Sequence, residues 1–331
     1  MLIKRLWLTK DPIQYQEWAD LMNMAGLALD MQVDWTVGIY ENQQLIASGS
    51  LDYNIIKCIA VTADYQSENV LSKLLTALKE PLRERQQSHI FLYTKPELRP
   101  IFQSLGFAEI ARTQTVIFME QGFPDIRAYQ KSLKAATRPT QGNAAIVMNA
   151  NPFTNGHLYL VTAAAKQHAT VYVFVVSEDR SLFDAATRIR LVKAGVAHLA
   201  NVVVLPTGEY LVSKATFPTY FLKDQAPEAV ANVQATLDAT LFKEKIAGIC
   251  RITTRYVGEE PLSKVTEIYN QALKAVLEPE LSLIVLPRKK VQGEVISASR
   301  VRKLIENKQY EALWPLVPLT TYQEITNQKT K

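Results

Sequence analysis

Two short clusters of residues combine side chains and a spacing suited to binding phosphate. The first, Thr154-Asn155-Gly156-His157, directly follows an apolar run that predicts a buried strand, and it is expected to open a helix. Free backbone N–H groups and the helix dipole at such a position attract anions, and a glycine lets the backbone approach a ligand closely. His157 can donate a hydrogen bond to an oxygen whose negative charge grows in the transition state. The cluster therefore predicts a phosphate-binding turn.

The second cluster, Ile296-Ser297-Ala298-Ser299-Arg300-Val301-Arg302, lies near the C-terminal end of the sequence and follows another predicted strand. Ser297 and Ser299 are of the type preferred at helix N-caps. Arg302 is expected one turn into the helix, where its fixed fork of donors suits phosphate oxygens. We therefore expect two helix N-termini, distant in the sequence, to meet around one triphosphate.

An alternation of strands and helices is expected to position these clusters. Strands are predicted at 144–150, 170–177, 202–206, 249–257 and 282–287, with helices near 156–168, 185–199, 228–245 and 262–277. The strand at 170–177 is apolar on both faces, as in a parallel sheet covered by helices on both sides. The pattern predicts a doubly wound, Rossmann-like α/β domain, in which ligands bind where strands end and helices begin.

The first 120 residues predict a different, α+β domain. Strands are expected at 35–41, 44–52, 55–62, 89–94, 107–111 and 114–120, and helices at 68–87 and 96–105. Residues 121–142 hold prolines and glycines around an amphipathic piece, which indicates a helical linker. The expected organisation is thus a domain at 1–120, a linker at 121–142 and a second domain at 143–331.

Composition narrows the classes of function. The chain has 331 residues, 48% of them hydrophobic and 21% charged, and a net charge of +5, which is ordinary for a two-domain globular protein. Lysines and arginines are spread along the chain instead of gathered in runs, so a nucleic-acid partner is not expected. A mildly basic protein that handles a polyanion such as ATP fits the same numbers.

The cysteines and the N-terminal residues indicate a cytoplasmic protein. Cys58 and Cys250 each lie inside an apolar stretch, far apart in sequence, so buried free thiols are expected instead of a metal site or a disulfide. The first 11 residues lack the features of a signal peptide. No stretch approaches the roughly 18 apolar residues that a membrane helix requires, so no membrane partner is expected.

The two clusters resemble the T-x-G-H and I-S-x-S-x-V-R signatures of the nucleotidyltransferase superfamily, which cleaves ATP between its α and β phosphates. Further stretches are similar to the citrate lyase ligase family, which also carries an N-terminal domain of the GNAT acyltransferase type. These stretches are Asn149-Ala150-Asn151-Pro152-Phe153, Pro206-Thr207-Gly208-Glu209-Tyr210, residues 213–221, residues 257–261 and the pair Tyr269-Asn270. The resemblance covers the whole chain.

The resemblance implies a defined reaction. ATP, acetate and the thiol of a phosphoribosyl dephospho-coenzyme A arm on the acyl carrier subunit of citrate lyase would give AMP, pyrophosphate and the acetyl thioester. Acetate would first form an acetyl-adenylate. Mg²⁺ is expected to arrive with ATP, held largely by its phosphates and water, and no metal site made of protein side chains is expected.

The resemblance also implies roles for single residues. Thr154 and His157 would contact the phosphates, with His157 at the α-phosphate, and Arg302 would complete the catalytic set. The residues expected to bind the nucleotide are Asn151, Phe153, Gly156, Gly258, Glu260, Ser297 and Ser299. Among these, Gly258 and Glu260 are candidates for the ribose or base side, and Ser297 and Ser299 would hold the departing pyrophosphate with Arg302.

The first domain departs from its GNAT-type family at one loop. Residues 65–71 resemble the loop that binds the pyrophosphate of coenzyme A, but Asn69 and Leu71 stand where that loop has small residues. Small residues let backbone N–H groups converge on the pyrophosphate. We therefore expect a GNAT fold that serves as a dock for the carrier protein or its pantetheine-like arm.

Two other functions stay open on the sequence. One is an adenylyltransferase of the phosphopantetheine or nicotinamide-mononucleotide type, which would join AMP permanently to a phosphate. The other is a non-catalytic adaptor that senses nucleotide. Only the ligase requires an acid such as acetate for exchange of pyrophosphate into ATP.

Overall fold

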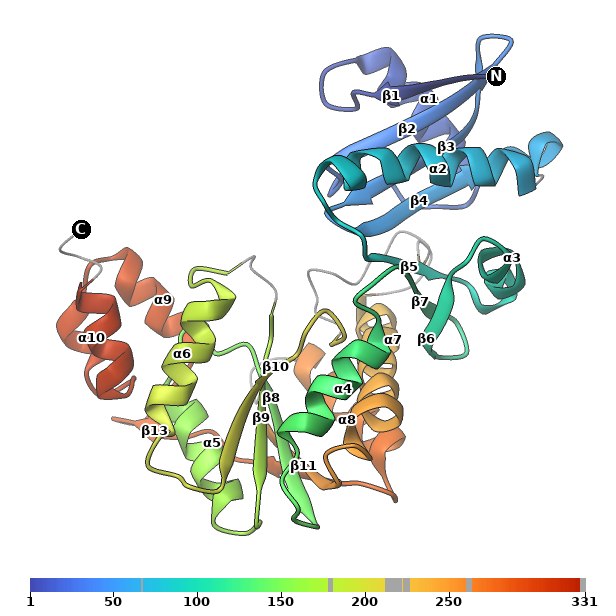
Figure 1. The fold of residues 1–331 in the computed structure, drawn as a ribbon. Coiled ribbons are helices and arrows are strands. Elements are labelled where there is room, and N and C mark those ends of the chain that lie inside the picture. The colour runs from blue at the N-terminus through green and yellow to red at the C-terminus, as the bar shows by residue number, and fades with distance from the viewer. Residues whose placement is uncertain (67, 178–180, 212–221, 223–226, 260–263, 328–331) are drawn as a thin grey trace. The chain divides into compact units, whose positions relative to one another are not determined.

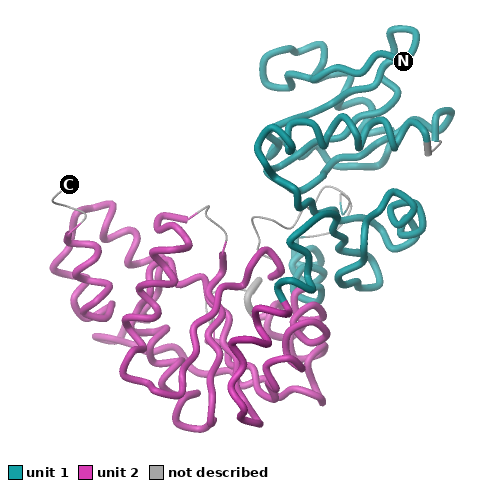
Figure 2. The backbone as a smooth tube through the Cα atoms, in the orientation of Figure 1, with its two compact units in different colours: residues 1–129, 214–237 teal, residues 130–213, 238–331 magenta. Residues whose placement is uncertain are grey.

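A computed structural model describes residues 1–331 except 67, 178–180, 212–221, 223–226, 260–263 and 328–331. The chain forms two compact units, each with its own core. The first comprises residues 1–129 and 214–237, and the second residues 130–213 and 238–331 (Figure 2). The first division of the chain, between residues 129 and 130, falls inside helix α4 (Ile126–Ala136), in the segment predicted to be a helical linker.

The first unit is built on a seven-stranded sheet. Its strands are β1 (Leu2–Leu6), β2 (Trp35–Glu41), β3 (Gln44–Asp52), β4 (Ile55–Val61), β5 (Ile90–Thr94), β6 (Ala108–Arg112) and β7 (Ile117–Gln121). Their order is β1-β2-β3-β4-β5-β7-β6, and every neighbouring pair is antiparallel except β4 with β5. One parallel pair inside an otherwise antiparallel sheet is the arrangement of the predicted GNAT-like α+β fold, which is confirmed.

Helix α2 (Glu68–Glu84) covers one face of this sheet. The predicted apolar stripe on it is buried among the strands, at Val70, Leu74, Leu75, Leu78 and Leu82. The predicted helix at 96–105 is a short 3₁₀ helix, η2 (Pro96–Leu98), followed by α3 (Arg99–Ser104).

Strand β1 and helix α1 (Pro12–Met24) were not predicted. The strand is a short edge strand with exposed side chains, so it lacks the apolar pattern of a buried one. The helix carries a start signal in the sequence, because Pro12 is its first residue and Asp11 caps it by accepting from the N–H groups of Ile13 and Gln14. That combination is typical of a helix N-terminus.

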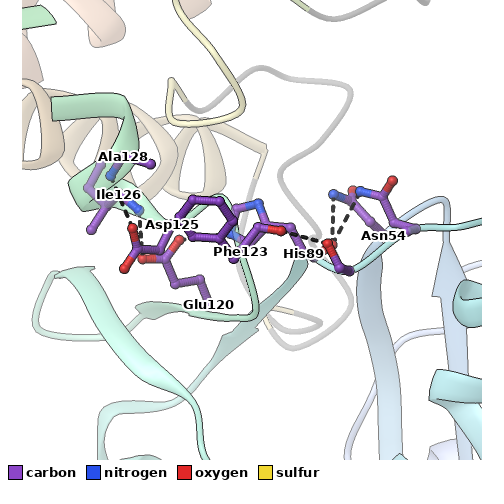
Figure 3. A network of polar contacts seen from close by, with 9 residues as sticks. Asn54, His89, Glu120, Phe123, Asp125, Ile126 and Ala128 are labelled. Atoms are coloured by element: carbon purple, nitrogen blue, oxygen red, sulfur yellow. Dashed lines mark hydrogen bonds and ion pairs between the residues drawn. The ribbon is translucent and has the colours of Figure 1, made fainter. Parts of the chain in front are cut away.

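Polar side chains hold the start of α4 at the end of strand β7 (Figure 3). The Glu120 carboxylate accepts from the N–H of Ile126 at 3.0 Å and lies 2.8 Å from Nε2 of His89. Asp125 accepts from the N–H of Ala128 at 3.0 Å. Because carboxylates near a helix N-terminus satisfy its free N–H groups, these contacts fix the direction in which α4 begins.

The second unit is built on a five-stranded parallel sheet. Its strands are β8 (Asn143–Met148), β9 (Val171–Val175), β10 (Val202–Pro206), β11 (Ile252–Gly258) and β12 (Ser282–Leu286). Their order is β10-β9-β8-β11-β12, and all pairs are parallel. The chain moves outward from β8 to β10 and then returns to the opposite side of β8, so the order reverses between β8 and β11. The predicted doubly wound α/β fold is confirmed, and this reversal marks the expected ligand site.

Helices cover both faces of this sheet (Figure 1). Helices α5 (Asn155–Ala165) and α6 (Ala185–Gly195) pack on one face. On the other face, the π-helical turn Phe242–Ala247, which follows α7 (Pro227–Leu241), places Phe242 against Phe174 of β9. Strand β9 is buried over its whole length, as its apolar sequence predicts.

A small helical layer ends the second unit. After β12 come a hairpin of β13 (Lys290–Val291) and β14 (Glu294–Val295), helix α9 (Ala298–Glu306), a 3₁₀ helix η5 (Tyr310–Leu313) and helix α10 (Leu319–Asn327). Helix α8 (Lys264–Leu277) precedes β12. Phe183 and Ile296 share a core with Val301 and Leu313, so α9 and η5 pack on residues near both predicted clusters. The hairpin was not predicted from the sequence.

Both cysteines are free and buried, as predicted. Burial raises the pKa of Cys58 to about 12 and also raises the pKa of Cys250. Neither thiol is therefore a reactive thiolate near neutral pH. Within the described ranges, no helix has the length and apolar character needed to cross a membrane.

Candidate active site

The first cluster forms the turn between β8 and α5. Thr154 is the N-cap of α5, and its hydroxyl oxygen accepts from the N–H of His157 at 3.3 Å. In return, Nδ1 of His157 accepts from the N–H of Thr154 at 3.0 Å. This reciprocal pattern is a capping box with histidine in the position where glutamate or glutamine is usual. It locks the His157 ring against the helix start.

The capping box also selects the protonation state of His157. Because Nδ1 accepts from a backbone N–H, it carries no proton, and the neutral ring must hold its proton on Nε2. Burial, first, and the positive charge of Arg288, second, together lower the pKa of His157 to about 4. The imidazole is therefore neutral at pH 7 and offers one N–H donor from Nε2.

The second cluster forms the start of α9. Ser297 is the N-cap, and its hydroxyl accepts from the N–H of Arg300 at 3.1 Å. The N–H of Ile296 donates to the carbonyl of Lys289 at 3.0 Å. The turn is thus tied to the segment that leaves β12.

The two turns lie against each other. Arg302 donates from Nη1 to the carbonyl oxygen of Asn151 at 2.7 Å and from Nη2 to the hydroxyl of Ser299 at 3.0 Å. A Cβ added at Gly156 would stand 3.3 Å from the carbonyl oxygen of Ile296. Glycine is therefore needed for this close approach. The expectation that both helix N-termini meet is confirmed.

A cavity of about 820 Å³ lies where the two turns meet. Its walls come from the end of β8, the first turns of α5, the end of β11, two residues of α8, the pair Arg288 and Lys289, and residues 294–299. Cavities of about 300–1,000 Å³ are usual for small-molecule ligands. The cavity also sits at the switch point of the sheet, and both capped helix N-termini contribute to it.

Most of the predicted site residues meet in this cavity. Its wall includes Thr154, Gly156, His157, Gly258, Ser297 and Ser299. Asn151 and Phe153 instead lie buried beneath the turn, where Phe153 stacks on His157 with ring centroids 5.8 Å apart. Arg302 adjoins the wall through its bonds to Asn151 and Ser299. Glu260 lies outside the described residues, as does the whole stretch 213–221.

Several polar residues of the wall were not predicted as site residues, among them Arg288, Lys289, Tyr269 and Asn270. Arg288 and Lys289 come directly after β12. Their position held a usable signal, because the carboxyl ends of parallel strands share one edge of the sheet, where ligands bind. Arg288 donates from Nε to the carbonyl of Glu259 at 2.7 Å, which ties the exit of β12 to the exit of β11.

A buried charged pair supports Tyr269 behind the cavity wall. The Tyr269 hydroxyl donates to Oδ2 of Asp238 at 2.7 Å, and Nη2 of Arg255 lies 3.3 Å from the same oxygen. Burial first, and then the negative charge of Asp238, raise the pKa of Tyr269. Tyr269 therefore stays protonated at neutral pH and serves as a fixed wall of the cavity.

Arg188 is fully buried. It donates from Nη1 to the backbone and side-chain oxygens of Asn149 at 3.0 and 2.6 Å, and to the carbonyl of Val176 at 2.7 Å. Its Nε donates to the carbonyl of Phe183 at 3.0 Å. Arg188 thus supports the turn after β8 from inside the fold.

These features define a doubly wound α/β domain with a nucleotide-sized cavity between two capped helix N-termini, the arrangement of the nucleotidyltransferase superfamily. Residues 143–325 match the profile of the citrate lyase ligase C-terminal domain. The chain belongs to the citrate lyase ligase family, whose characterised members are ligases.

Full-length relatives agree with that assignment. The [citrate [pro-3S]-lyase] ligase of Escherichia coli K12 is 36% identical over 318 residues, which cover 94% of this chain and 90% of that protein. The [citrate [pro-3S]-lyase] ligase of Klebsiella pneumoniae is 36% identical over 324 residues, or 96% and 94% of the two chains. A phosphopantetheine adenylyltransferase of Pasteurella multocida is 47% identical, but over only 57 residues, or 17% of this chain and 36% of that protein.

Proposed function

We propose that this protein uses ATP to activate acetate and then acetylates the prosthetic-group thiol on the acyl carrier subunit of citrate lyase. The observation that carries the proposal is the meeting of the Thr154–His157 turn and the Ser297–Arg302 turn around one cavity. The likeness to citrate lyase ligases over nearly the whole chain favours this substrate and partner over others.

The proposed reaction has two steps. In the first, a carboxylate oxygen of acetate attacks the α-phosphorus of ATP, the bond from that phosphorus to the oxygen bridging the β-phosphate breaks, and pyrophosphate leaves. In the second, the thiolate sulfur attacks the acetyl carbon, and AMP leaves with the electron pair of the broken bond. Acetate is ionised at pH 7, as an ordinary carboxyl group is, so the first step needs no general base.

The residues of the site must then stabilise charge on the phosphates. Enzymes lower such barriers by roughly 8–23 kcal/mol, whereas one preorganised donor supplies about 3–4 kcal/mol and a helix end about 0.3–2 kcal/mol. Nε2–H of His157 therefore cannot act alone. We assign it to the α-phosphate, with Thr154 beside it, and we assign Ser297, Ser299 and Arg302 to the departing pyrophosphate.

The remaining assignments follow from the same proposal. Gly258 and Glu260 are assigned to the ribose or base side of the nucleotide, and Asn151, Phe153 and Gly156 shape the turn that receives it. Mg²⁺ would enter with ATP. We propose a cytoplasmic location, where ATP and the acyl carrier subunit would be available.

We also propose that residues 1–120 form the domain that docks the carrier protein or its pantetheine-like arm, with 121–142 as linker and 143–331 as catalytic domain. A cavity of about 500 Å³ in the first unit supports a binding role, because Gln66 of the altered loop contributes to its wall. Asn69 and Leu71 still argue against a bound coenzyme A pyrophosphate.

Isotope exchange tests the proposed function. Labelled pyrophosphate should enter ATP only when acetate is present, and a panel of short carboxylic acids should show the preferred substrate. Acetate-independent exchange that requires a phosphorylated cofactor would instead identify an adenylyltransferase, the alternative that the local likeness to phosphopantetheine adenylyltransferase favours. If the protein binds ATP but releases no pyrophosphate with any of the acids tested, it is a nucleotide-sensing adaptor.

A further inference from the structure

Arg288 occupies a fixed place on the wall of the cavity. It lies two residues past the end of β12 and lines the cavity together with His157. Its Nε donates to the carbonyl of Glu259 at 2.7 Å, and the neighbouring Lys289 carbonyl accepts from the N–H of Ile296 at 3.0 Å. The segment is therefore held on one side by the exit of β11 and on the other by the second turn.

The other basic side chains around the described part of the cavity either lie on α9 or are exposed. Arg302 bonds Asn151 and Ser299, so its fork already joins the two turns. Arg300 pairs with Glu294 at 2.7 Å. Lys289 is exposed, whereas Arg288 is half-buried. Of the two basic residues that line the described part of the cavity, Arg288 is the half-buried one, which places it well to act near the first turn.

His157 itself brings no positive charge to the cavity. Burial is the first cause of its low pKa, and the charge of Arg288 is the second. The influence of Arg288 on the imidazole agrees with their shared position on the wall. Because His157 is neutral, it offers a hydrogen bond but no net charge to a phosphate.

We propose that Arg288 is a further catalytic residue, which binds the α-phosphate of ATP beside His157 and stabilises it as the carboxylate attacks. The inference rests on the proposed function, because it places the α-phosphate at His157. The attack brings two anions together, and their repulsion is strong where water is scarce. A guanidinium offsets this repulsion and keeps its own charge at all relevant pH values. Arg288 supplies the charge, and His157 supplies a directed donor.

Titration of His157 gives the first test, independent of any activity. In the full-length protein, the imidazole signals of isotope-labelled histidines are followed by NMR against pH, with His157→Gln to assign the signal. Arg288→Ala and Arg288→Gln should each raise the pKa of His157 from about 4 toward the ordinary value of 6.5. The control Lys290→Ala removes a nearby exposed charge that does not line the cavity, and it should leave the titration unchanged.

Ligand binding and exchange give the second test. Measured by calorimetry, the affinity for ATP should fall at least tenfold in Arg288→Ala. The affinity for adenosine, which has no phosphate, should not change. In pyrophosphate exchange Arg288→Ala should lower kcat by about 100-fold, the usual effect of losing one transition-state donor. Arg288→Lys should retain part of this activity because the charge remains, and Lys290→Ala should retain all of it.

The outcomes separate this inference from the proposed function. Unchanged titration of His157 in both Arg288 variants, or ATP affinity and exchange equal to those of Lys290→Ala, would overturn the role of Arg288. If the unmodified protein shows no acetate-dependent exchange, the proposed function fails. The titration of His157 and the comparison of ATP with adenosine binding would still test the role of Arg288. Arg288→Gln removes the charge but keeps a polar side chain with the first methylene groups, so it disturbs the packing less than Arg288→Ala.

Discussion

The two helix starts that meet at the cavity are built in different ways. The start of α5 is the more buried one and carries no charge, with Thr154 and Phe153 inside the fold and a half-buried histidine held neutral by the capping box. The start of α9 is more open, with Ser299 exposed and Arg302 half-buried. Donors shielded from water act more strongly because water does not compete with them, whereas a half-buried cation that water still reaches releases an anion more readily.

This difference suits a reaction in which one part of the nucleotide reacts and another part departs. The α5 start offers fixed donors for the phosphorus under attack. The α9 start offers hydroxyls and a cation for a pyrophosphate that must leave. Loss of a donor at the first start should therefore lower the rate, and loss of the cation at the second should affect both binding and rate.

The largest effect is expected at the first start. His157→Ala should lower kcat in pyrophosphate exchange by about 100- to 1,000-fold, because it removes a preorganised donor from the transition state. His157→Gln should retain part of the activity, since its amide N–H can replace Nε2–H. Thermal unfolding should show that both variants are folded. Full activity of His157→Ala would remove the distinction between the two starts.

A smaller effect is expected at the second start. Arg302→Ala removes the bonds to Asn151 and Ser299, and hydrogen bonds to a charged group contribute about 1.5–3 kcal/mol each. We expect kcat/KM for ATP to fall by about 10- to 100-fold, with KM raised as well as kcat lowered. Arg302→Lys keeps the positive charge but not the planar guanidinium group, so it separates the effect of the charge from that of the two bonds. If Arg302→Ala lowers kcat and leaves KM unchanged, the α9 start acts in the same way as the α5 start.

The close approach of the two starts is tested at Gly156. Gly156→Ala places a Cβ 3.3 Å from the carbonyl oxygen of Ile296, so the turns must separate by a few tenths of an ångström. Overpacking of this kind costs about 1–3 kcal/mol. We expect the rate of pyrophosphate exchange to fall because the turns separate. Gly248→Ala, where no atom lies within 4 Å of the added Cβ, is the matched control. Equal behaviour of both variants in exchange and urea unfolding would show that the contact is unimportant.

The smallest effect concerns pH. The pKa of His157 is about 4 in the fold and 6.5 in the unfolded chain. Between these values the unfolded state binds the additional proton, so stability rises with pH. The contribution is complete above about pH 6.5 and is lost as pH falls toward 4. Urea unfolding at several pH values should show a shallower dependence for His157→Gln than for the unmodified protein, and parallel curves would contradict the buried, neutral histidine.

Much of this site was readable in the sequence because it depends on local signals. Strands apolar on both faces predicted the parallel sheet, and Thr154 and Ser297 marked the helix starts that the structure confirms. Arg288 was missed because its role depends on which strands are neighbours, and β11 and β12 meet only through the order of the sheet. The edge strand β1 was missed because its side chains are largely exposed and leave little apolar pattern.

The buried position of Arg188 has a consequence for how the nucleotide would be received. One guanidinium bonds chain segments that follow β8, follow β9 and precede α6. These segments are therefore held in place by the protein's own contacts, and a ligand need not restrict them on arrival. Ordering a backbone residue costs roughly 1–2 kcal/mol. If these segments were a loose loop instead, the affinity for ATP would be lower even with every phosphate contact kept.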